Sequence, residues 1–209
     1  MTEFSTFFAG LLVYLVGTAS PGPANLSIAN AAMNYGRKAG LVLASGVISG
    51  SLCWGVMTGI GVSALLASHP AFIFWLKIAG AVYLLWLGYK ALRRALSNTP
   101  PSAKKVGEAP ANSLGFYLQG LGIHLTNPKA VLTWFTVTSV GLSASSPKGG
   151  VFLLVGSCAL MGMAIFCLYA VAFSARSAEA FFLRTRRGFD LLCVFFYLLF
   201  ALGFIVSLR

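Results

Sequence analysis

Two clusters of helix-breaking residues lie inside otherwise apolar stretches of this sequence. They are Ser20-Pro21-Gly22-Pro23 and Thr126-Asn127-Pro128-Lys129. Each proline removes a backbone donor and clashes with the preceding helical turn, so a regular helix cannot continue through either cluster. In a bilayer the freed carbonyl groups must be satisfied by protein or by water. Both clusters are therefore expected to face a protein-lined cavity, where freed backbone groups, Asn25 and Asn127 bind polar atoms of a substrate.

Three titratable side chains within apolar stretches are candidates for proton coupling. Lys129 directly follows the second cluster, and it is expected to bind a substrate carboxylate or to lose and regain a proton. His124 lies one turn before that cluster, where it either packs as a satisfied histidine or handles protons. Lys77 lies near the end of its apolar stretch, so its ammonium group either lines a cavity or snorkels to the interface.

The composition predicts an integral membrane protein. Charged residues make up only 9% of the 209 residues, hydrophobic types make up 58%, and mean hydropathy is +0.85. A soluble domain carries about 25% charged residues. Charge is absent from residues 4–36, 39–76, 149–175 and 191–208. A membrane-spanning helix needs ~20 apolar residues, so these runs favour membrane helices over a very apolar soluble protein.

Six hydrophobic segments predict six transmembrane helices. Their approximate bounds are 4–34, 40–67, 71–92, 114–143, 149–174 and 189–208. Residues 97–113 contain prolines and charges and are expected to form a cytoplasmic linker. This linker separates a first three-helix repeat, residues 1–96, from a second one, residues 114–209.

The two halves resemble each other when the first is shifted by 106 positions. Residues 21–23 then coincide with residues 127–129, and Gly50-Ser51 coincides with Gly156-Ser157. Because three is an odd number, such halves enter the membrane in opposite senses. The predicted fold class is therefore an all-α integral membrane protein with six transmembrane helices in two inverted three-helix repeats, of which helices 1 and 4 are broken.

Paired broken helices in inverted repeats are typical of the binding site of a secondary transporter. The alternative is a pair of simple proline kinks, which are common in membrane helices. We expect the paired breaks to form a substrate site. The predicted substrate-binding residues are Pro21, Gly22, Pro23, Asn25, Asn127, Pro128 and Lys129.

The distribution of cations predicts the orientation. Formal net charge is +11, and eleven cations fall in the loops after segments one, three and five, whereas only Lys148 and Arg209 fall on the other face. The positive-inside rule places the richer face in the cytoplasm, with both termini outside a bacterial inner membrane. Orientation explains these charges better than binding to nucleic acid does. The eleven are Arg37, Lys38, Lys90, Arg93, Arg94, Lys104, Lys105, Arg176, Arg184, Arg186 and Arg187.

Several stretches together carry a resemblance to one family. They are residues 20–23 with Asn25, Gly36-Arg37-Lys38-Ala39-Gly40, the glycine-rich second helix, LKIAGAVYLLWLG at residues 76–88, and Asn127-Pro128-Lys129-Ala130. Along its whole length the chain resembles the LysE/RhtB family of amino-acid exporters. The resemblance implies efflux of amino acids or similar metabolites, driven by the proton gradient.

The chain departs from this family's pattern in its second helix. Some members carry an acidic residue just after a GxxxG motif, but here the motif at residues 46–50 is followed by Ser51. The first five segments contain no Asp or Glu, and Asp190 lies at the edge of the sixth. The usual intramembrane carboxylate for a proton relay is therefore missing. This absence disfavours a cationic substrate and favours a neutral amino acid such as threonine or homoserine.

Two other classes of protein fit less well. A thiol–disulfide electron carrier of the CcdA/DsbD type would use Cys53 and Cys158, which lie in equivalent helices, but neither break has a cysteine beside it. An intramembrane enzyme would need clustered carboxylates or a paired serine and histidine, and the chain has only four acidic residues and no GxSxG. We therefore expect a transporter, with no catalytic residues and no metal or other cofactor.

Small residues on the second segment predict close helix packing. Gly46 and Gly50, and then Gly55 and Gly59, form two pairs of the small-xxx-small type. The sequence leaves open whether these pairs pack within one subunit or in a homodimer.

Overall fold

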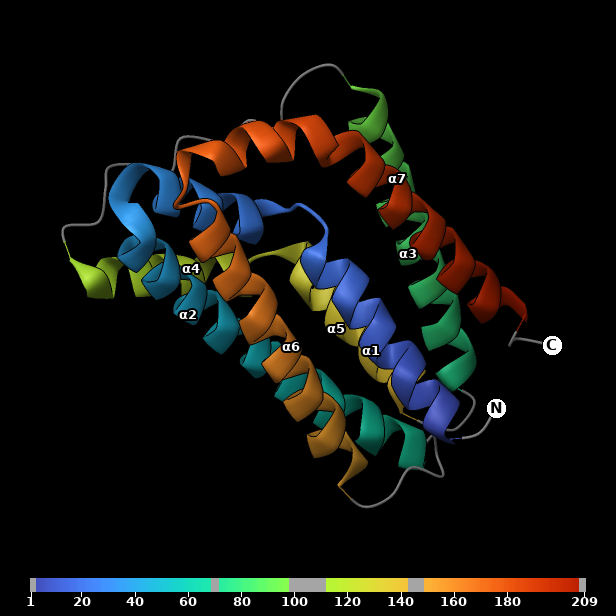
Figure 1. Cartoon of the computed structure of the whole chain (residues 1–209). Coiled ribbons are helices and arrows are strands. Elements are labelled where there is room, and N and C mark those ends of the chain that lie inside the picture. The colour runs from blue at the N-terminus through green and yellow to red at the C-terminus, as the bar shows by residue number, and fades with distance from the viewer. Residues whose placement is uncertain (1–2, 69–71, 98–111, 143–148, 207–209) are drawn as a thin grey trace.

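The computed structural model describes residues 3–68, 72–97, 112–142 and 149–206, and within these ranges the chain is helical without strands (Figure 1). The helices are α1 (Glu3–Ala19), α2 (Pro23–Ser68), α3 (Phe72–Leu96), α4 (Ser113–Leu125), α5 (Pro128–Gly141), α6 (Gly150–Ala172) and α7 (Arg176–Val206). The prediction of an all-helical chain is confirmed for the described residues.

Two interruptions fall inside predicted segments one and four, as expected, whereas α7 begins at Arg176, well before the predicted start of the sixth segment near residue 189. α1 ends at Ala19 and α2 begins at Pro23, and α4 ends at Leu125 and α5 begins at Pro128. Both interruptions coincide with the proline clusters, because proline is tolerated at the first turn of a helix but not in its interior. We call residues 20–22 the first break and residues 126–127 the second break.

The third interruption is a kink inside α2 at Gly36. Its φ of 86° and ψ of 168° are not helical, and this region of backbone space is essentially restricted to glycine. The kink divides α2 into a short piece, residues 23–35, and a long piece, residues 37–68. The short piece completes the first predicted segment, and the long piece contains the second.

Helices from the first half pack on helices from the second half. α2 lies against α4 and α6, α3 lies against α7, and α1 lies against α5. Figure 1 shows α1 and α5 side by side near the middle of the molecule, with α3 and α7 paired along one flank. Residues far apart in sequence are therefore neighbours around the two breaks.

Glycines bring α2 and α4 into direct backbone contact. A Cβ added at Gly46 would lie 2.0 Å from the carbonyl oxygen of Tyr117, and one added at Gly120 would lie 2.1 Å from that of Leu43. Larger residues would force the helices apart. The first predicted glycine pair thus packs within the chain, and so does the second, because a Cβ at Gly55 would meet the ring of Trp134 at 2.7 Å.

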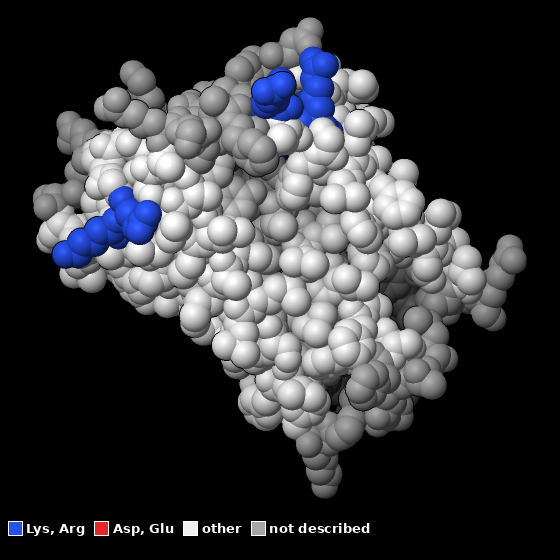
Figure 2. Space-filling model, in the orientation of Figure 1, with Lys and Arg blue, Asp and Glu red and all other residues white. Residues whose placement is uncertain are grey.

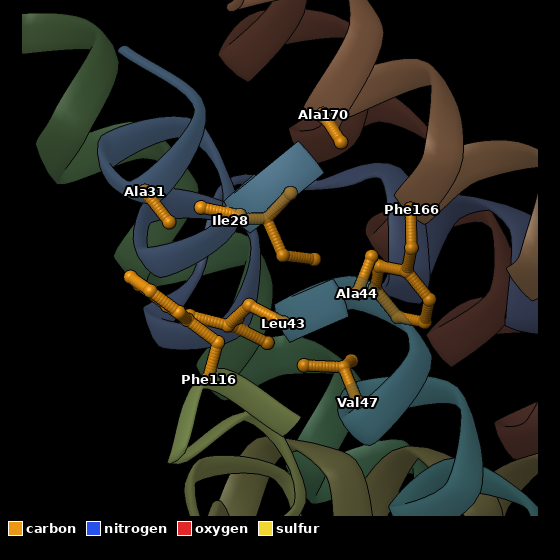
Figure 3. Close-up of a cluster of buried hydrophobic side chains, with 10 residues drawn as sticks. Ile28, Ala31, Leu43, Ala44, Val47, Phe116, Phe166 and Ala170 are labelled. Atoms are coloured by element: carbon orange, nitrogen blue, oxygen red, sulfur yellow. The ribbon is translucent and has the colours of Figure 1, made fainter. Parts of the chain in front are cut away.

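A hydrophobic cluster joins α2, α4 and α6, as Figure 3 shows. The side chains that it labels come from both pieces of α2 and from the two facing helices. They are Ile28, Ala31, Leu43, Ala44, Val47, Phe116, Phe166 and Ala170. The cluster fixes the short piece of α2 and the end of α6 beside α4, and so positions the residues of both breaks.

The outward faces of the helices are also apolar. Phe152, Leu160 and Leu168 of α6 are each at least 65% exposed, which suits contact with lipid chains. Two helical stretches of the described residues, Pro23–Gly61 and Gly150–Ala172, are by themselves long and apolar enough to cross a membrane. Ser5–Ala19 is apolar but shorter.

Basic side chains gather at one end of the molecule. Figure 2 shows Lys and Arg near the upper and left edges of this face, and no acidic side chain on its described part. The start of α1 and the end of α7 lie together near the opposite end (Figure 1). The side chain of Lys77, most of the 97–113 linker, Lys148 and Arg209 lie outside the described residues.

Candidate functional site

A small cavity lies where the two helix breaks meet. It has a volume of about 30 Å³ and is lined by residues of α1, α2, α4, α5 and α6, together with both breaks. We call it the central cavity. Polar side chains that line it include Thr18, Asn25, Ser51, His124, Asn127 and Lys129.

A second and larger space adjoins the first. This vestibule has a volume of about 630 Å³ and reaches from the breaks toward Lys90 and Arg94 of α3. Gly22, Asn127 and Lys129 line both spaces, so these three residues mark their junction. The vestibule thus connects the breaks with the end of α3 that carries basic residues.

Lys129 bridges the two breaks. Its backbone belongs to α5 just after the second break, whereas its Nζ donates to the carbonyl oxygen of Ser20 at 2.7 Å and to the hydroxyl oxygen of Ser20 at 2.6 Å. The last carbonyl groups of a helix carry partial negative charge, which stabilises a nearby cation. Lys129 is therefore held by the end of α1, while Asp190 is paired with Arg94 at 2.9 Å.

Side chains from several helices cap the carbonyl groups at the end of α1. The Nδ2 atom of Asn25 donates to the carbonyl oxygen of Thr18 at 2.8 Å and to that of Ser20 at 3.3 Å. The hydroxyl of Tyr169 donates to the carbonyl oxygen of Ala19 at 2.9 Å. Helix α2, helix α5 through Lys129, and helix α6 thus all satisfy acceptors that the first break frees.

Helix α7 reaches the same point through Tyr197. Its hydroxyl lies 2.8 Å from the hydroxyl of Ser20, which itself donates to the carbonyl oxygen of Gly17 at 3.1 Å. Tyr197 is only 1% exposed. Sequence reasoning missed Tyr169 and Tyr197, although a tyrosine in an apolar segment needs a partner for its hydroxyl when buried.

The second break is capped by its own neighbours. The side-chain oxygen of Asn127 accepts from the backbone N–H of Lys129 at 3.0 Å, and its carbonyl oxygen accepts from that of Ala130 at 2.9 Å. The hydroxyl of Thr126 donates to the carbonyl oxygen of Gly122 at 2.8 Å. Asn127 therefore acts as an N-cap for α5.

The start of α2 is not capped in this way. Its first backbone hydrogen bond runs from the N–H of Leu26 to the carbonyl oxygen of Gly22, at 2.9 Å. Within the described residues, no hydrogen bond engages the N–H groups of Ala24 and Asn25. Free N–H groups at a helix start attract anions. A Cβ at Gly22 would lie 3.1 Å from the Nζ atom of Lys129, so this glycine brings the ammonium group close to the helix start.

A hydroxyl network lies in the central cavity. The hydroxyl of Ser51 lies 3.1 Å from that of Tyr14 and accepts from the indole N–H of Trp134 at 3.0 Å. The ring centroids of Tyr14 and Trp134 are 4.9 Å apart. None of these three was predicted from the sequence as a site residue, because nothing in their spacing shows that α1, α2 and α5 converge.

The predicted substrate-binding residues all line one or both spaces. Pro21, Pro23 and Pro128 line the vestibule, Asn25 lines the central cavity, and the junction holds the remaining three. The side chains of Asn25 and Asn127 already hydrogen-bond within the protein. Of the predicted proton-coupling residues, His124 and Lys129 line the central cavity, and the side chain of Lys77 lies outside the description.

The four cysteines are free and line neither space. Cys158 is fully buried in a hydrophobic cluster with Val13, Trp134 and Leu154. Buried cysteines of this kind behave as small apolar residues. The arrangement gives no support to a thiol–disulfide pathway along the two breaks.

Comparison with known proteins places the chain among transport proteins. The family described as LysE type translocator matches residues 15–208. A threonine efflux protein of Escherichia coli is 27% identical over 152 residues, which cover 71% of this chain and 74% of that protein. A leucine efflux protein of Klebsiella pneumoniae is 29% identical over 182 residues, which cover 84% of this chain and 83% of that protein. No solved structure matches the chain.

Proposed function

Because the chain belongs to the family of LysE type translocators, we propose that it exports neutral amino acids from the bacterial cytoplasm. Members of this family are transporters, not enzymes. The similar proteins of Escherichia coli and Klebsiella pneumoniae are named for the efflux of threonine and of leucine, which are both neutral amino acids. We infer the same class of substrate, neutral amino acids, for this chain.

The observation that carries the proposal is the pairing of opposite polarity at the breaks. Free N–H groups start α2 and suit a substrate carboxylate, whereas the capped carbonyl groups that end α1 suit an ammonium group. Lys129 already places an ammonium group on the carbonyl oxygen of Ser20. A free amino acid carries both of these charged groups on one carbon, so it matches the junction of the two spaces.

The charge of the lining favours a neutral side chain. Among the described residues, no Asp or Glu lines the central cavity or the vestibule, whereas Lys129 lines both. A cationic side chain would add a second positive charge beside Lys129 without a counter-charge, which is costly in a membrane. A neutral amino acid leaves only its own two charges to be matched.

The vestibule is the proposed entry route from the cytoplasm. It extends toward Lys90 and Arg94, and the positive-inside rule assigns a cation-rich end to the cytoplasm. The proposed topology therefore has six membrane spans in two inverted three-helix repeats, with both termini outside the inner membrane. The pairing of α1 with α5, α2 with α4 and α6, and α3 with α7 supports the repeats, since each pair joins the two halves.

Coupling to protons is part of the proposal and would run through Lys129. Ser51 lies in the central cavity and shares its hydroxyl with Tyr14 and Trp134. The described residues place no carboxylate in this cavity for a relay. Loss of a proton would turn the Lys129 ammonium group into a neutral amine, which would weaken its hold on the Ser20 carbonyl oxygen. The substrate ammonium group and the protonated Lys129 would thus compete for the same carbonyl groups.

Efflux from preloaded cells tests the proposal. Cells that overproduce the chain are loaded with a panel of labelled neutral, cationic and acidic amino acids, and release is compared with that from cells carrying an empty vector. We expect faster release of neutral members only, and slower release after an uncoupler dissipates the proton gradient. Faster release of lysine or glutamate alone, or of none of the panel, would contradict the proposed function. An uncoupler without effect would remove proton coupling alone.

A further inference from the structure

His124 is a buried side chain without a hydrogen-bond partner in the described protein. It is 6% exposed, and neither Nδ1 nor Nε2 engages another described group. A buried polar nitrogen without a hydrogen-bond partner destabilises the fold, so an unpaired imidazole is unexpected in a packed helix. His124 lines the central cavity, so a molecule in that cavity can supply the missing partner.

Packing holds the imidazole of His124 at the cavity wall. Its ring meets that of Phe166 edge to face, at 6.0 Å between centroids. The Cβ of His124 also lies against Gly50, since a Cβ added to this glycine would be 3.0 Å from it. This packing limits reorientation of the imidazole toward another hydrogen-bond partner. The ring is therefore preorganised for binding.

The size of the central cavity restricts what reaches His124. About 30 Å³ holds only one or two groups of the size of a water molecule. The charged end of an amino acid is assigned to the junction with the larger vestibule, so the central cavity receives the end of its side chain. A short side chain with one polar group fits this space better than a long one.

The chemistry of the lining identifies that polar group. A neutral imidazole offers one donor and one acceptor, and a hydroxyl group also donates and accepts. The hydroxyls of Ser51 and Tyr14 line the same cavity. Of the described residues that line this cavity, only Lys129 is charged, so a charged group on the substrate side chain would lack a partner.

We propose that His124 binds the side-chain hydroxyl of a small neutral amino acid and selects hydroxylated substrates over aliphatic ones. The inference rests on the proposed function and adds the residue that discriminates among its substrates. Phe166, Ser51 and Trp134 form the walls around this group. A substrate of the same shape with a methyl in place of the hydroxyl would leave His124 unpaired.

Threonine and valine provide the test because they are nearly isosteric. Vesicles that contain the full-length protein are loaded with threonine and valine at equal concentration, and the release rates of the two amino acids are compared. We expect wild-type protein to release threonine at least about tenfold faster than valine, since a site built for a hydroxyl rejects an analogue that lacks it. In His124→Phe the ratio should fall toward one, chiefly through slower release of threonine.

A matched control separates this effect from loss of any buried polar atom. Trp54 also has a buried, unpaired ring nitrogen, but it lines neither space. Trp54→Phe should keep the wild-type ratio. His124→Asn retains a donor and an acceptor and should give an intermediate threonine-to-valine ratio. This variant tests the role of His124 if His124→Phe does not reach the membrane.

The outcomes distinguish the inference from the function on which it rests. If wild-type protein releases neither amino acid, the proposed function fails. If it releases both at similar rates, or valine faster, the hydroxyl site is overturned while export stands. An unchanged threonine-to-valine ratio in His124→Phe and His124→Asn, with protein present in the membrane, would also overturn the role of His124.

Discussion

At the first break, side chains of α2, α5, α6 and α7 gather on the end of α1, whereas at the second break α4 and α5 are capped by residues 126 and 127 themselves. The hydroxyl of Tyr169 reaches Ala19 across 150 positions of sequence. The side-chain oxygen of Asn127 reaches the N–H of Lys129 across two. One break is therefore defined by tertiary contacts and the other by local sequence.

This difference bears on how the protein moves. A displacement of α5, α6 or α7 would uncover carbonyl groups at the end of α1, because Lys129, Tyr169 and Tyr197 donate to the carbonyl oxygens of Ser20, Ala19 and Val16. The second break would keep its caps in any arrangement. We therefore expect the hydrogen bonds at the first break to change when the surrounding helices move, and the second break to move as a unit with α4 and α5.

Lys129 should give the largest effect, since it joins the two breaks. Lys129→Ala removes two charge-assisted hydrogen bonds to Ser20, each worth about 1.5–3 kcal/mol. We expect export to fall about tenfold to a hundredfold, or more if the lysine also binds the substrate. Lys129→Arg should not restore it fully, because guanidinium neither loses a proton readily nor matches the compact ammonium. Efflux from preloaded cells, normalised to membrane protein, measures this.

Lys38→Ala is the matched control for Lys129, since Lys38 is exposed and lines neither space. It should export at close to the wild-type rate. Wild-type export by Lys129→Ala would show that the two breaks function without their bridge, and would move the binding site elsewhere.

The packing beside the second break can be tested with two neighbouring glycines. Gly120→Ala places a Cβ 2.1 Å from the carbonyl oxygen of Leu43, and overpacking of this kind costs about 1–3 kcal/mol. At Gly122 an added Cβ meets nothing within 4 Å, and alanine favours a helix by ~0.8–1.0 kcal/mol over glycine. Thermal unfolding in detergent should show opposite shifts. A similar shift in both variants would contradict close packing of α4 on α2.

The two asparagines compare the breaks most directly. Asn25→Ala leaves the carbonyl groups of Thr18 and Ser20 with fewer donors, at about 1–3 kcal/mol. Asn127→Ala removes a local N-cap, which is typically worth ~1 kcal/mol. Asn127→Ser should retain the cap and most of the stability. Unfolding temperatures rank the three variants, and equal losses in Asn25→Ala and Asn127→Ala would remove the proposed distinction between the breaks.

The cysteines should give the smallest effect, because neither break has a cysteine beside it. Replacing Cys53, Cys158, Cys167 and Cys193 with alanine is expected to leave export largely intact. Loss of packing at Cys158, which is fully buried, should lower the unfolding temperature slightly. If export were lost while the protein stayed in the membrane, a thiol–disulfide function would have to be reconsidered.

The positions of both breaks followed from proline chemistry, since proline is tolerated at the first turn of a helix, as at Pro23 and Pro128, but disrupts a helix interior. The lining of the site by residues 21–23 and 127–129 could be predicted for the same reason. The caps from Tyr169 and Tyr197 could not, because no local pattern tells which distant backbone group a tyrosine hydroxyl meets. Local sequence likewise does not show that the His124 nitrogens lack a hydrogen-bond partner among the described residues, because this depends on how α2, α4 and α6 pack.

The sequence by itself determined that the chain is helical and apolar, where its helices break, and that it belongs with the LysE type translocators. These properties depend on composition, on proline and glycine, and on motifs of a few adjacent residues. Only the tertiary structure decided that Lys129 caps α1, that Gly46 and Gly120 pack inside the chain, and that His124 faces the central cavity. Each of these depends on the positions of helices distant in sequence, which long-range packing sets and local patterns do not encode.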